Sequence, residues 1–456
     1  MKLETTDKRA NNKKMSALLW LVPLCLVGVL ATVAVMVCEM EQPRVQLLRE
    51  VSRLGSATPV ALAVTDAKRG VRTMEVTLLQ GNRQVVLFRK DYPGQGTVFA
   101  TGPAQVKEEF VVDIPALGFA EGGATLEIVA RDYSWWNFRR GNMALISLPV
   151  TIDTRPPLVT ISSSPMDIQA GGAGLVIYQI SEPAARHGVT LNGDFHPGYP
   201  LPGRGDNVYG ATIAVRYDAE KIDQAFVAAT DQAGNVGRAV FGMTLHPMAK
   251  KSDSINLDDA FLNQKIPEFA DHYRDLKGTP LEQYLVINNR IRKENNDRIA
   301  EVCRAVTPER FWQGTFWRMA RSSPKARYAD HRTYLYQGEE IDEQVHLGID
   351  LASTRHAEVG AANRGRVAFA DYLGIYGNMV ILDHGQGLFS LYSHLSQINC
   401  KVGDILDQGA TLGLTGTSGM AGGDHLHFSI LVNGIFVNPL EWWDPHWLKV
   451  NIDPYL

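Results

Sequence analysis

The stretch that most constrains this chain is Met15 to Val37, where 23 successive residues carry no charged side chain. A helix of that length rises about 1.5 Å per residue and spans roughly 34 Å, which matches the apolar thickness of a bilayer. The run is longer than the apolar core of a cleavable signal peptide and ends in Val35, Met36 and Val37 rather than in small residues. The sequence therefore predicts an uncleaved transmembrane helix over 15–37.

The charges that flank this run predict the direction in which the chain crosses the membrane. The tail at 1–14 carries five basic residues and the sixteen residues after the run carry three, namely Lys2, Lys8, Arg9, Lys13 and Lys14 against Arg44, Arg49 and Arg53. Basic residues collect on the cytoplasmic side of membrane proteins. We therefore expect a cytoplasmic tail, a single pass through the inner (cytoplasmic) membrane, and all later domains outside the cytoplasm, in the periplasm or on the cell-wall side.

The charge balance excludes one broad class of partner. The 456 residues include 45 Lys and Arg against 49 Asp and Glu, a formal net charge of -4. Without a basic excess to neutralise phosphates, we expect no nucleic-acid partner.

A hydrophobic content of 45% suffices for several cores, and at about 100 to 200 residues per domain the length predicts two to four domains. The sequence names no protein partner.

Two successive regions show the pattern of β-sandwiches. Short apolar alternations broken by Gly, Pro and Asp fill residues 57–155, and a second set of short strands fills 156–247 after a Pro-Pro joint. The stretches 126–137 and 225–235 both run from a strand into an Asp-led turn, which either an internal repeat or common strand chemistry explains. We expect two immunoglobulin-like β-sandwich modules over these ranges.

Residues 252–326 change to a helical pattern. Thr279, Pro280 and Glu282 supply a capping residue, a proline at the first helical position and an acid at the third. Apolar residues then form an approximate stripe as far as Cys303, consisting of Tyr284, Leu285, Ile287, Ile291, Ile299 and Val302. This stripe predicts a helical segment that buries one face.

The four cysteines allow two interpretations. Cys25 and Cys38 belong to the predicted anchor, which leaves Cys303 and Cys400 as the pair in an oxidising compartment. Either these two form a disulfide or they are two buried free thiols.

Five residues near the C-terminus form three short motifs. His346 and Asp350 lie in VHLGIDLA, His394 lies in LYSHLS, and His425 and His427 lie in GGDHLHFSI. Residues i and i+2 of a strand point to one face, about 6 to 7 Å apart, so the last two imidazoles share a face. A hydrolytic zinc site needs three nitrogen or carboxylate ligands and one open position for water. His346, Asp350 and one histidine of the HLH pair would supply these ligands.

The spacing of the first two ligands sets a condition on the backbone. A regular strand would hold His346 and Asp350 about 13 Å apart, so we expect an irregular turn, which Gly348 permits. The two imidazoles outside the ligand set would act as a general base or as donors to the developing oxyanion.

Five short motifs occur near the C-terminus. They are HLGID, LYSHL and HLHF, with GNMVILDHG and VGDILDQGATLGLTGTSG between them. Their order resembles that of the M23 family of zinc metallopeptidases, the LytM or lysostaphin-type peptidoglycan endopeptidases, and the likeness covers roughly 333–440. The resemblance implies that His346, Asp350 and His427 bind Zn2+ and that His394 and His425 are the catalytic histidines. It also implies a small antiparallel β-sheet with a groove, which we place at 327–445.

The expected fold class is mainly β, with the transmembrane helix, the two sandwiches, the helical segment and the peptidase domain in that order. The leading hypothesis is a membrane-anchored zinc metalloendopeptidase that hydrolyses peptide cross-links of cell-wall peptidoglycan. The alternative is a catalytically silent wall-binding or scaffold protein that regulates other peptidoglycan hydrolases, and a third hypothesis is a zinc peptidase acting on proteins. The sequence leaves open which peptide bond is cut.

The role of the helical segment also has two explanations. Residues 256–303 either pack on the peptidase domain near its groove and restrict access, or act as a spacer whose stripe is buried against the second sandwich. Among the other histidines, we expect His384 to be structural and His331, His356 and His446 to lie at the surface.

Overall fold

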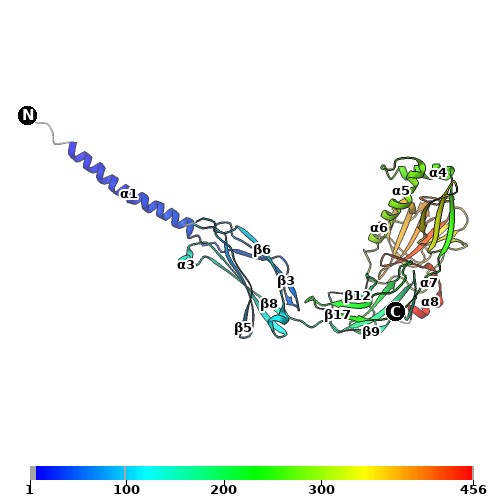
Figure 1. Ribbon diagram of the computed structural model, residues 1–456, viewed down its shortest axis with the longest axis horizontal. Helices are drawn as coiled ribbons and strands as arrows, with labels where there is room; N and C mark the ends of the chain where they lie inside the picture. Colours follow the sequence, from blue (N-terminus) through cyan, green and yellow to red (C-terminus); the bar gives the residue numbers. More distant parts are fainter. Residues whose placement is uncertain (1–6, 97–98, 454–456) are drawn as a thin grey trace, which may run out of the picture. The chain divides into compact units, whose positions relative to one another are not determined.

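The computed structural model describes the backbone of residues 7–96 and 99–453, with side chains from residue 21 onward. The chain is mainly β, as predicted, and Figure 1 labels several of its elements. It divides into two compact units, Met1–Pro156 with Asp231–Asn235, and Pro157–Thr230 with Val236–Leu456. Each unit is described by itself.

The first unit begins with helix α1 (Asp7–Val37), which contains the uncharged run and has Pro23 in its interior. The part of the chain that the structure describes includes no helix long and apolar enough to cross a membrane. The prediction of a transmembrane helix at 15–37 is therefore not confirmed here. Of the predicted cytoplasmic tail, residues 1–6 lie outside the described residues and residues 7–14 form the start of α1.

Two sheets form the rest of the first unit. A three-stranded sheet has the order β1 (Arg44–Leu47), β3 (Thr58–Thr65), β6 (Gln105–Val112). A five-stranded sheet has the order β2 (Arg53–Leu54), β8 (Met143–Ile152), β7 (Gly122–Asp132), β4 (Val71–Gln80), β5 (Arg83–Asp91). Alternate residues of both sheets, such as Leu62, Val76 and Ile128, are fully buried in one cluster. Short helices α2 (Ile114–Leu117) and α3 (Trp136–Arg139) lie in the connections.

The second unit starts with two four-stranded sheets. One has the order β14 (Tyr199–Pro200), β15 (Val208–Ala214), β11 (Ala173–Ile180), β9 (Val159–Ser163). The other has the order β13 (Asp194–Pro197), β12 (Arg186–Leu191), β16 (Ala225–Thr230), β17 (Val236–Val240). A short parallel pair, β10 (Asp167–Gln169) with β18 (Thr244–His246), completes this part. Buried residues of both sheets, including Val176, Val189 and Val227, share one core.

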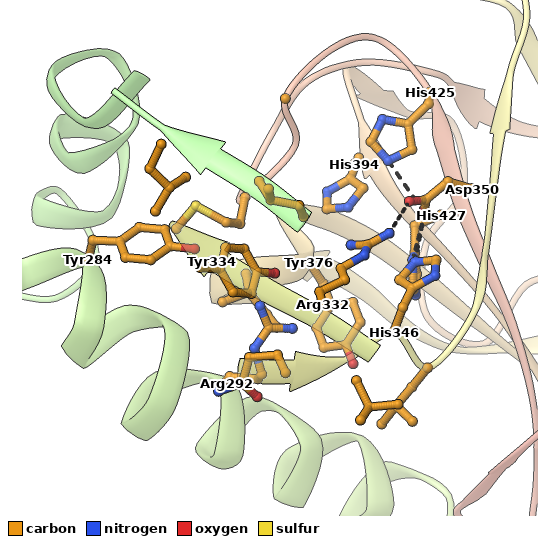
Figure 2. Close-up of a pocket in the computed structure, with 18 of the residues that line it drawn as sticks. Tyr284, Arg292, Arg332, Tyr334, His346, Asp350, Tyr376, His394, His425 and His427 are labelled. Atoms are coloured by element: carbon orange, nitrogen blue, oxygen red, sulfur yellow. Dashed lines mark hydrogen bonds and ion pairs between the residues drawn. The ribbon is translucent and has the colours of Figure 1, made fainter. Parts of the chain in front are cut away.

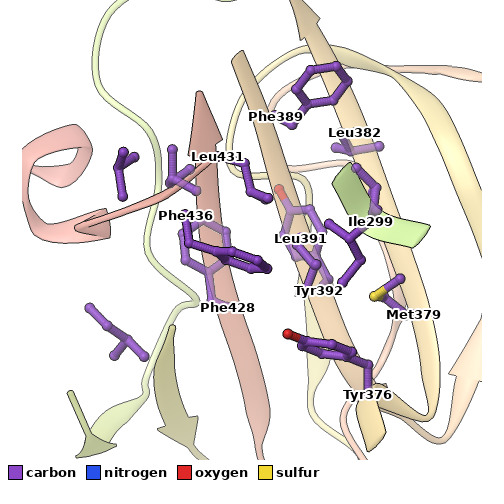
Figure 3. Packing of buried hydrophobic residues seen from close by; sticks show 14 of the residues in the cluster. Ile299, Tyr376, Met379, Leu382, Phe389, Leu391, Tyr392, Phe428, Leu431 and Phe436 are labelled. Atoms are coloured by element: carbon purple, nitrogen blue, oxygen red, sulfur yellow. The ribbon is translucent and has the colours of Figure 1, made fainter. Parts of the chain in front are cut away.

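The helical segment follows strand β19 (Lys251–Leu257) and consists of α4 (Asp259–Ala270), α5 (Pro280–Val286), the π-helix η1 (Ile287–Ile291) and α6 (Arg292–Val302). The predicted capping box forms, because Thr279 Oγ1 accepts from the N–H of Glu282 and the Glu282 carboxylate accepts from the N–H of Thr279. Four residues of the stripe are buried, namely Tyr284, Ile287, Ile291 and Ile299, and the other two are half-buried. Figure 3 shows Ile299 beside Leu391 and Met379 of the C-terminal domain. This face of the helices therefore packs on the C-terminal domain, and whether the segment restricts access or acts as a spacer stays a prediction.

The last domain is built on antiparallel strands, as expected. Its main sheet has the order β20 (Ser323–Ala326), β23 (Ile349–Ala352), β31 (Leu426–Val432), β27 (Leu388–Leu395), β26 (Asn378–Gly385), β25 (Gly365–Tyr372), β29 (Ile405–Leu406), with β32 (Ile435–Val437) paired to β31. A smaller sheet has the order β24 (Glu358–Gly360), β30 (Thr411–Leu414), β28 (Gln397–Ile398). The 3-10 turn η2 (Gly374–Tyr376) and the helices α7 (Pro439–Trp443) and α8 (Pro445–Asn451) complete the domain.

A third sheet joins the helical segment to the C-terminal domain. Strand β19 pairs in parallel with β21 (Asp330–Tyr336), which pairs with β22 (Glu339–Val345) in antiparallel fashion. The sequence did not predict this strand, which lies at the start of the helical region. All four cysteines are free, so Cys303, which is buried, and Cys400 form no disulfide.

Candidate metal centre and its cavity

Strand pairing brings the three predicted ligands together. Asp350 on β23 lies directly opposite His427 on β31 in the antiparallel register. His346 follows the end of β22, and the chain bends at Gly348 before β23 begins. The irregular turn predicted from the spacing is confirmed.

The ligand atoms of these residues converge on one point (Figure 2). His346 Nε2 lies 2.9 Å from Asp350 Oδ1 and 2.8 Å from His427 Nδ1, and His427 Nδ1 lies 3.0 Å from Asp350 Oδ1. All three residues are buried and are grouped closely enough to hold one metal ion. The structure thus selects His427, rather than His425, from the HLH pair as the residue closest to His346.

The hydrogen bonds behind the two imidazoles fix their tautomers. His346 Nδ1 lies 2.9 Å from the carbonyl oxygen of Arg327, which can only accept, so this nitrogen carries the hydrogen. Ser429 Oγ donates its single hydrogen to the carbonyl of Leu347 and therefore accepts from His427 Nε2, at 3.1 Å. Both imidazoles consequently turn a bare lone pair toward Asp350.

This donor set fits zinc. Two imidazole lone pairs and a carboxylate oxygen at 2.8 to 3.0 Å repel one another unless a proton or a cation lies among them. Two histidines and one carboxylate form a known ligand set of catalytic zinc sites, which keep a further position open. Partners on the far side of ligating imidazoles, here Arg327 and Ser429, are also characteristic of such sites. His346, Asp350 and His427 are the residues that would hold the ion.

The second oxygen of Asp350 is paired as well. Arg332 on β21 donates from Nη2 to Asp350 Oδ2 at 2.9 Å. Asp350 is therefore a carboxylate, as a metal ligand must be.

His394 and His425 lie beside the three ligands without joining them. His394 Nδ1 donates to the carbonyl of Ser418 at 2.9 Å, and His425 Nδ1 donates to the carbonyl of Gly423 at 2.7 Å. His425 Nε2 faces Asp350 Oδ1 at 3.5 Å, while His394 Nε2 has no hydrogen-bond partner among the described residues. Each imidazole therefore leaves Nε2 available for a proton at the site.

The pKa values of these two histidines shift in opposite directions, although burial acts to lower both. Burial lowers the pKa of His394 well below its usual value, and the neighbouring His425 and His427 add to the effect. Burial also disfavours the charged form of His425, but the Asp350 carboxylate outweighs it and raises the pKa of His425. The pKa of His427 falls to about 4, again through burial. His394 and His427 are thus neutral at pH 7.

Gly348 is required for space rather than for its backbone angle. A Cβ at this position would lie 2.6 Å from His427 Cε1 and Nε2 and from the carbonyl oxygen of Phe428. The sequence argument that glycine permits the bend was therefore incomplete, because the ring of His427 packs against the bare Cα. Any side chain here must displace a ligand.

The five residues line a cavity of about 590 Å³. Residues of the helical segment and of β19 form the opposite side, and these are Ile255, Asn256, Leu257, Asp258, Phe261, Tyr284, Arg292 and Asn296. Figure 2 shows Tyr284 and Arg292 extending from the helices toward the histidines. The expectation that the segment packs near the groove is confirmed, and the site is covered by residues from outside the motifs.

Two further side chains, Arg332 and Tyr376, lie near the site. Arg332 gave no signal in the sequence, because an arginine in an alternating strand has no motif of its own. Tyr376 lines the cavity and donates from its hydroxyl to Asn296 Oδ1 at 2.7 Å. His384 is fully buried and bonds the Arg364 carbonyl and Ser390, in agreement with its predicted structural role.

Comparison with known proteins identifies the domain that carries the motifs. Residues 344–439 match peptidase family M23. Over 98 residues the chain is 36% identical to the DD-carboxypeptidase/endopeptidase Mpg of Neisseria meningitidis serogroup B (strain ATCC 13091 / M2091), covering 22% of this chain and 23% of Mpg. Over 106 residues it is 35% identical to the murein hydrolase activator EnvC of Escherichia coli (strain K12), covering 23% of this chain and 25% of EnvC. The matches span about a quarter of these relatives.

Solved structures give weaker likenesses. A Pseudomonas aeruginosa protein assigned to peptidase M23 is 18% identical, covers 60% of this chain and 94% of its own, and has a TM-score of 0.40. The catalytic domain of lysostaphin from Staphylococcus simulans is 25% identical, covers 29% of this chain and 98% of its own, and has a TM-score of 0.25. These scores are too low to support an argument, so the sequence match carries the identification. The chain contains a domain of peptidase family M23 over residues 344–439.

Proposed function

We propose that this protein is a membrane-anchored zinc metalloendopeptidase that hydrolyses peptide cross-links of cell-wall peptidoglycan outside the cytoplasmic membrane. The observation that carries the proposal is the convergence of three lone-pair donors, His346 Nε2, Asp350 Oδ1 and His427 Nδ1. The tautomers of the two imidazoles are fixed by their other hydrogen bonds. Two further imidazoles, at His394 and His425, face the same cavity and do not belong to the ligand set. This combination supplies both a metal site and groups that move protons.

The chemistry follows from which atoms are free. A zinc ion held by the three ligands would supply Lewis-acid chemistry toward the peptide carbonyl and the attacking water. Hydrolysis of an amide also needs one proton removed from water and one delivered to the departing amine. His394 and His425 can exchange these protons at Nε2, because their Nδ1 hydrogens are held by backbone carbonyls. Removal of either imidazole should therefore slow the reaction without removing the metal.

The substrate class rests on relatives that are similar to one domain only. Mpg is named a DD-carboxypeptidase/endopeptidase, and a Vibrio cholerae relative, 35% identical over 96 residues, is named the peptidoglycan DD-endopeptidase ShyC. The name of ShyC favours peptidoglycan peptides over protein substrates. We propose no nucleic-acid substrate, because a net charge of -4 leaves no basic excess to neutralise phosphates.

The location is proposed from the N-terminal sequence. The uncharged run at 15–37 lies in one helix, and the side chains from Leu21 to Met36 include many exposed large apolar residues. Such a surface favours lipid over water. We place the N-terminus in the cytoplasm and the remaining domains in the periplasm or on the cell-wall side, from the basic residues at 1–14.

A fusion tests this topology. A reporter that is active only outside the cytoplasm, fused after Leu456, should be active, and the same reporter fused before Met1 should be inactive. A stable C-terminal fusion without activity would contradict the location and remove the wall as a substrate.

A second candidate function has one observation in its favour. The domain is similar to EnvC, whose name describes it as a murein hydrolase activator, so the chain is also a candidate for a silent regulator of other hydrolases. The complete ligand set argues against this alternative, because a binding module has no need of three converging lone pairs.

One experiment separates the two functions. The full-length zinc-loaded protein is incubated with intact peptidoglycan, and the released muropeptides are identified by mass. The enzyme should convert cross-linked dimers into monomers, and the His425→Ala variant should not. Unchanged dimers with folded, zinc-loaded protein would refute the enzyme and leave the regulator.

A further inference from the structure

We propose that the cavity contains a carboxylate-binding subsite built around Arg292, with Arg332 as a second positive charge in the same cavity, which selects peptides that carry a free carboxylate next to the scissile bond. The inference rests on the proposed function and gives its substrate a defined charge. Both arginines line the cavity that contains the zinc ligands, and both lie outside the family match at 344–439. The subsite is therefore a property of this chain's own cover over the site.

Arg292 is held in place by an irregular helix. It is the first residue of α6 and follows directly on the π-helix η1 (Ile287–Ile291), a rare geometry that occurs often at functional sites. Its Nε donates to the carbonyl of Asn288 at 3.0 Å, and its Nη2 donates to Asn288 Oδ1. Asn288 is fully buried and is fixed in turn by Asp342 Oδ2, at 2.7 Å. The guanidinium is thus oriented before any substrate arrives.

The remaining edge of this guanidinium is free to bind. No hydrogen bond to Arg292 Nη1 is found in the part of the chain that the structure describes. Figure 2 shows Arg292 between the helices and Tyr376, on the side of the cavity opposite the histidines. An oriented guanidinium with an open edge binds a carboxylate in a defined geometry, unlike the mobile point charge of a lysine.

Arg332 adds a second positive charge. Its side chain is 18% exposed, and Nη2 pairs with Asp350 Oδ2. Its Nε is buried and has no hydrogen-bond partner in the described structure. A buried donor without a partner is costly, and an acceptor brought by a ligand would relieve that cost.

The charge balance of the cavity favours an anionic ligand. The acidic lining residues are Asp258 and Asp350, and the arginines are Arg292 and Arg332. Asp258 already accepts from the N–H of Phe261 as the cap of α4, and Asp350 belongs to the metal ligand set. With a divalent cation bound, the cavity carries a net positive charge. A neutral peptide such as a glycine bridge would leave that charge uncompensated.

The carboxylate has two chemical sources. In a cross-link made through a side-chain amine, the residue on the amine side of the scissile bond keeps its own α-carboxylate. In an uncross-linked peptide, the last residue supplies a terminal carboxylate at the same distance from the bond. The chemistry is shared, so the experiment must separate the sources.

The test uses the full-length zinc-loaded protein and three pairs of synthetic substrates. The pairs are built on a cross-linked stem-peptide dimer, a linear stem peptide and a glycine-bridged dimer. The two members of each of the first two pairs carry either a free carboxylate or a carboxamide beside the bond. The two members of the third pair have matched neutral or acidic ends. We expect the carboxylate forms to be preferred by about tenfold to a hundredfold in kcat/KM, mainly through KM. Preference within the dimer pair, the linear pair or both identifies the source.

Variants of Arg292 make the prediction specific. Arg292→Met should reduce the preference to less than about threefold with unchanged zinc content. Arg292→Lys should restore part of the preference, since lysine returns the positive charge without the planar guanidinium that can form two hydrogen bonds to a carboxylate. The matched control is Arg298→Met on the same helix, where the arginine is exposed and pairs with Glu301. Arg332 is not the test position, because it touches a metal ligand.

A binding measurement separates this inference from the proposed function. Calorimetry on chelator-treated protein should show tighter binding of the carboxylate peptides than of the carboxamides, and Arg292→Met should abolish the difference. If peptides bind in this way but zinc-loaded protein cleaves none of them, the endopeptidase proposal fails and the subsite stands. Any of four results overturns the subsite. These are equal cleavage of the carboxylate and carboxamide forms, equal binding of the two forms, absence of binding, and a preference that survives Arg292→Met.

Discussion

The two sides of the cavity have different origins. One side, the histidine wall, consists of His346, Asp350, His394, His425 and His427, and all of it lies within the M23 match. The other side, the helical cover, consists of the lining residues between Ile255 and Asn296, and none of it does. The histidine wall brings together the donor set of a zinc site, whereas the helical cover sets the shape and charge of the space in front of it. Under the proposed function, the histidine wall carries the reaction and the helical cover selects the substrate.

The largest expected effect tests the histidine wall. His427→Ala removes one of three converging ligands and should abolish stoichiometric zinc binding, together with activity. His425→Ala should retain zinc and lose about 10²- to 10⁴-fold in turnover, the usual contribution of a general acid or base. Metal analysis and turnover of both variants decide the assignment. Zinc lost from His425→Ala and kept by His427→Ala would reverse it.

A core substitution tests whether the helical cover belongs to the folded domain. Ile299 on α6 is fully buried beside Leu391 and Met379 (Figure 3). Ile299→Ala should lower the free energy of unfolding by about 2 to 5 kcal/mol, the usual range for a buried isoleucine, without changing zinc stoichiometry.

The control for this variant is Ile405→Ala, where the side chain is 48% exposed and the cost should stay below about 0.5 kcal/mol. Denaturant unfolding measures both. Equal, small losses would mean that the helices are a detachable lid. The measured cost also bears on a truncation before Ser323, which we expect to expose the core that Ile299 fills rather than to release a faster enzyme.

A single methyl group tests how tightly the ligands are packed. Gly348→Ala would place Cβ 2.6 Å from His427 Cε1 and Nε2, so the ring must move away from its position opposite Asp350. Zinc affinity should fall by about 10- to 100-fold, as when a partner that orients a ligand is removed. Gly422→Ala, where nothing lies within 4 Å of a new Cβ, should bind zinc normally. Competition with a chelator of known affinity measures both, and an unchanged affinity for Gly348→Ala would show that the ring has room to move.

Much of the histidine wall was predictable from the sequence, for particular reasons. The i, i+2 spacing of His425 and His427 placed them on one face, and both line the cavity. The long separation of His346 and Asp350 along a strand required the bend at Gly348. Choosing His427 over His425 as the ligand needed the family resemblance, because the alternation of side chains along a strand does not indicate which imidazole binds the metal. The roles of His394 and His425 stay predictions.

The helical cover was predictable as helix but not as part of a site. The capping box at Thr279 and the apolar stripe predicted the helices, since both depend on neighbouring residues. The position of Arg292 depends on a π-turn and on the buried Asn288, and neither leaves a periodic signal. The parallel pairing of β19 with β21 joins residues 251–257 to 330–336, a separation that local pattern cannot bridge.

The smallest expected effect concerns the point at which the helical cover supports the histidine wall directly. Lys265 on α4 is buried and donates from Nζ to the carbonyl of Thr417, and Glu268 accepts from the N–H of Gly419. Between them lies Ser418, whose carbonyl accepts the Nδ1 hydrogen of His394. Helix α4 therefore holds the loop that fixes the His394 tautomer, although it touches no zinc ligand through these bonds.

Lys265→Met keeps most of the apolar stem and removes the donor to Thr417, so the loop should loosen while the fold and the metal ligands persist. We expect turnover to fall severalfold with KM and zinc content nearly unchanged, because the loss is in the orientation of His394. Lys293→Met, at an exposed position of α6 paired with Asp297, is the matched control and should behave as the parent. Lys265→Arg should recover part of the loss by restoring the donor. A Lys265→Met protein that loses stability but keeps full turnover would confine α4 to a structural role and leave the two sides of the cavity independent.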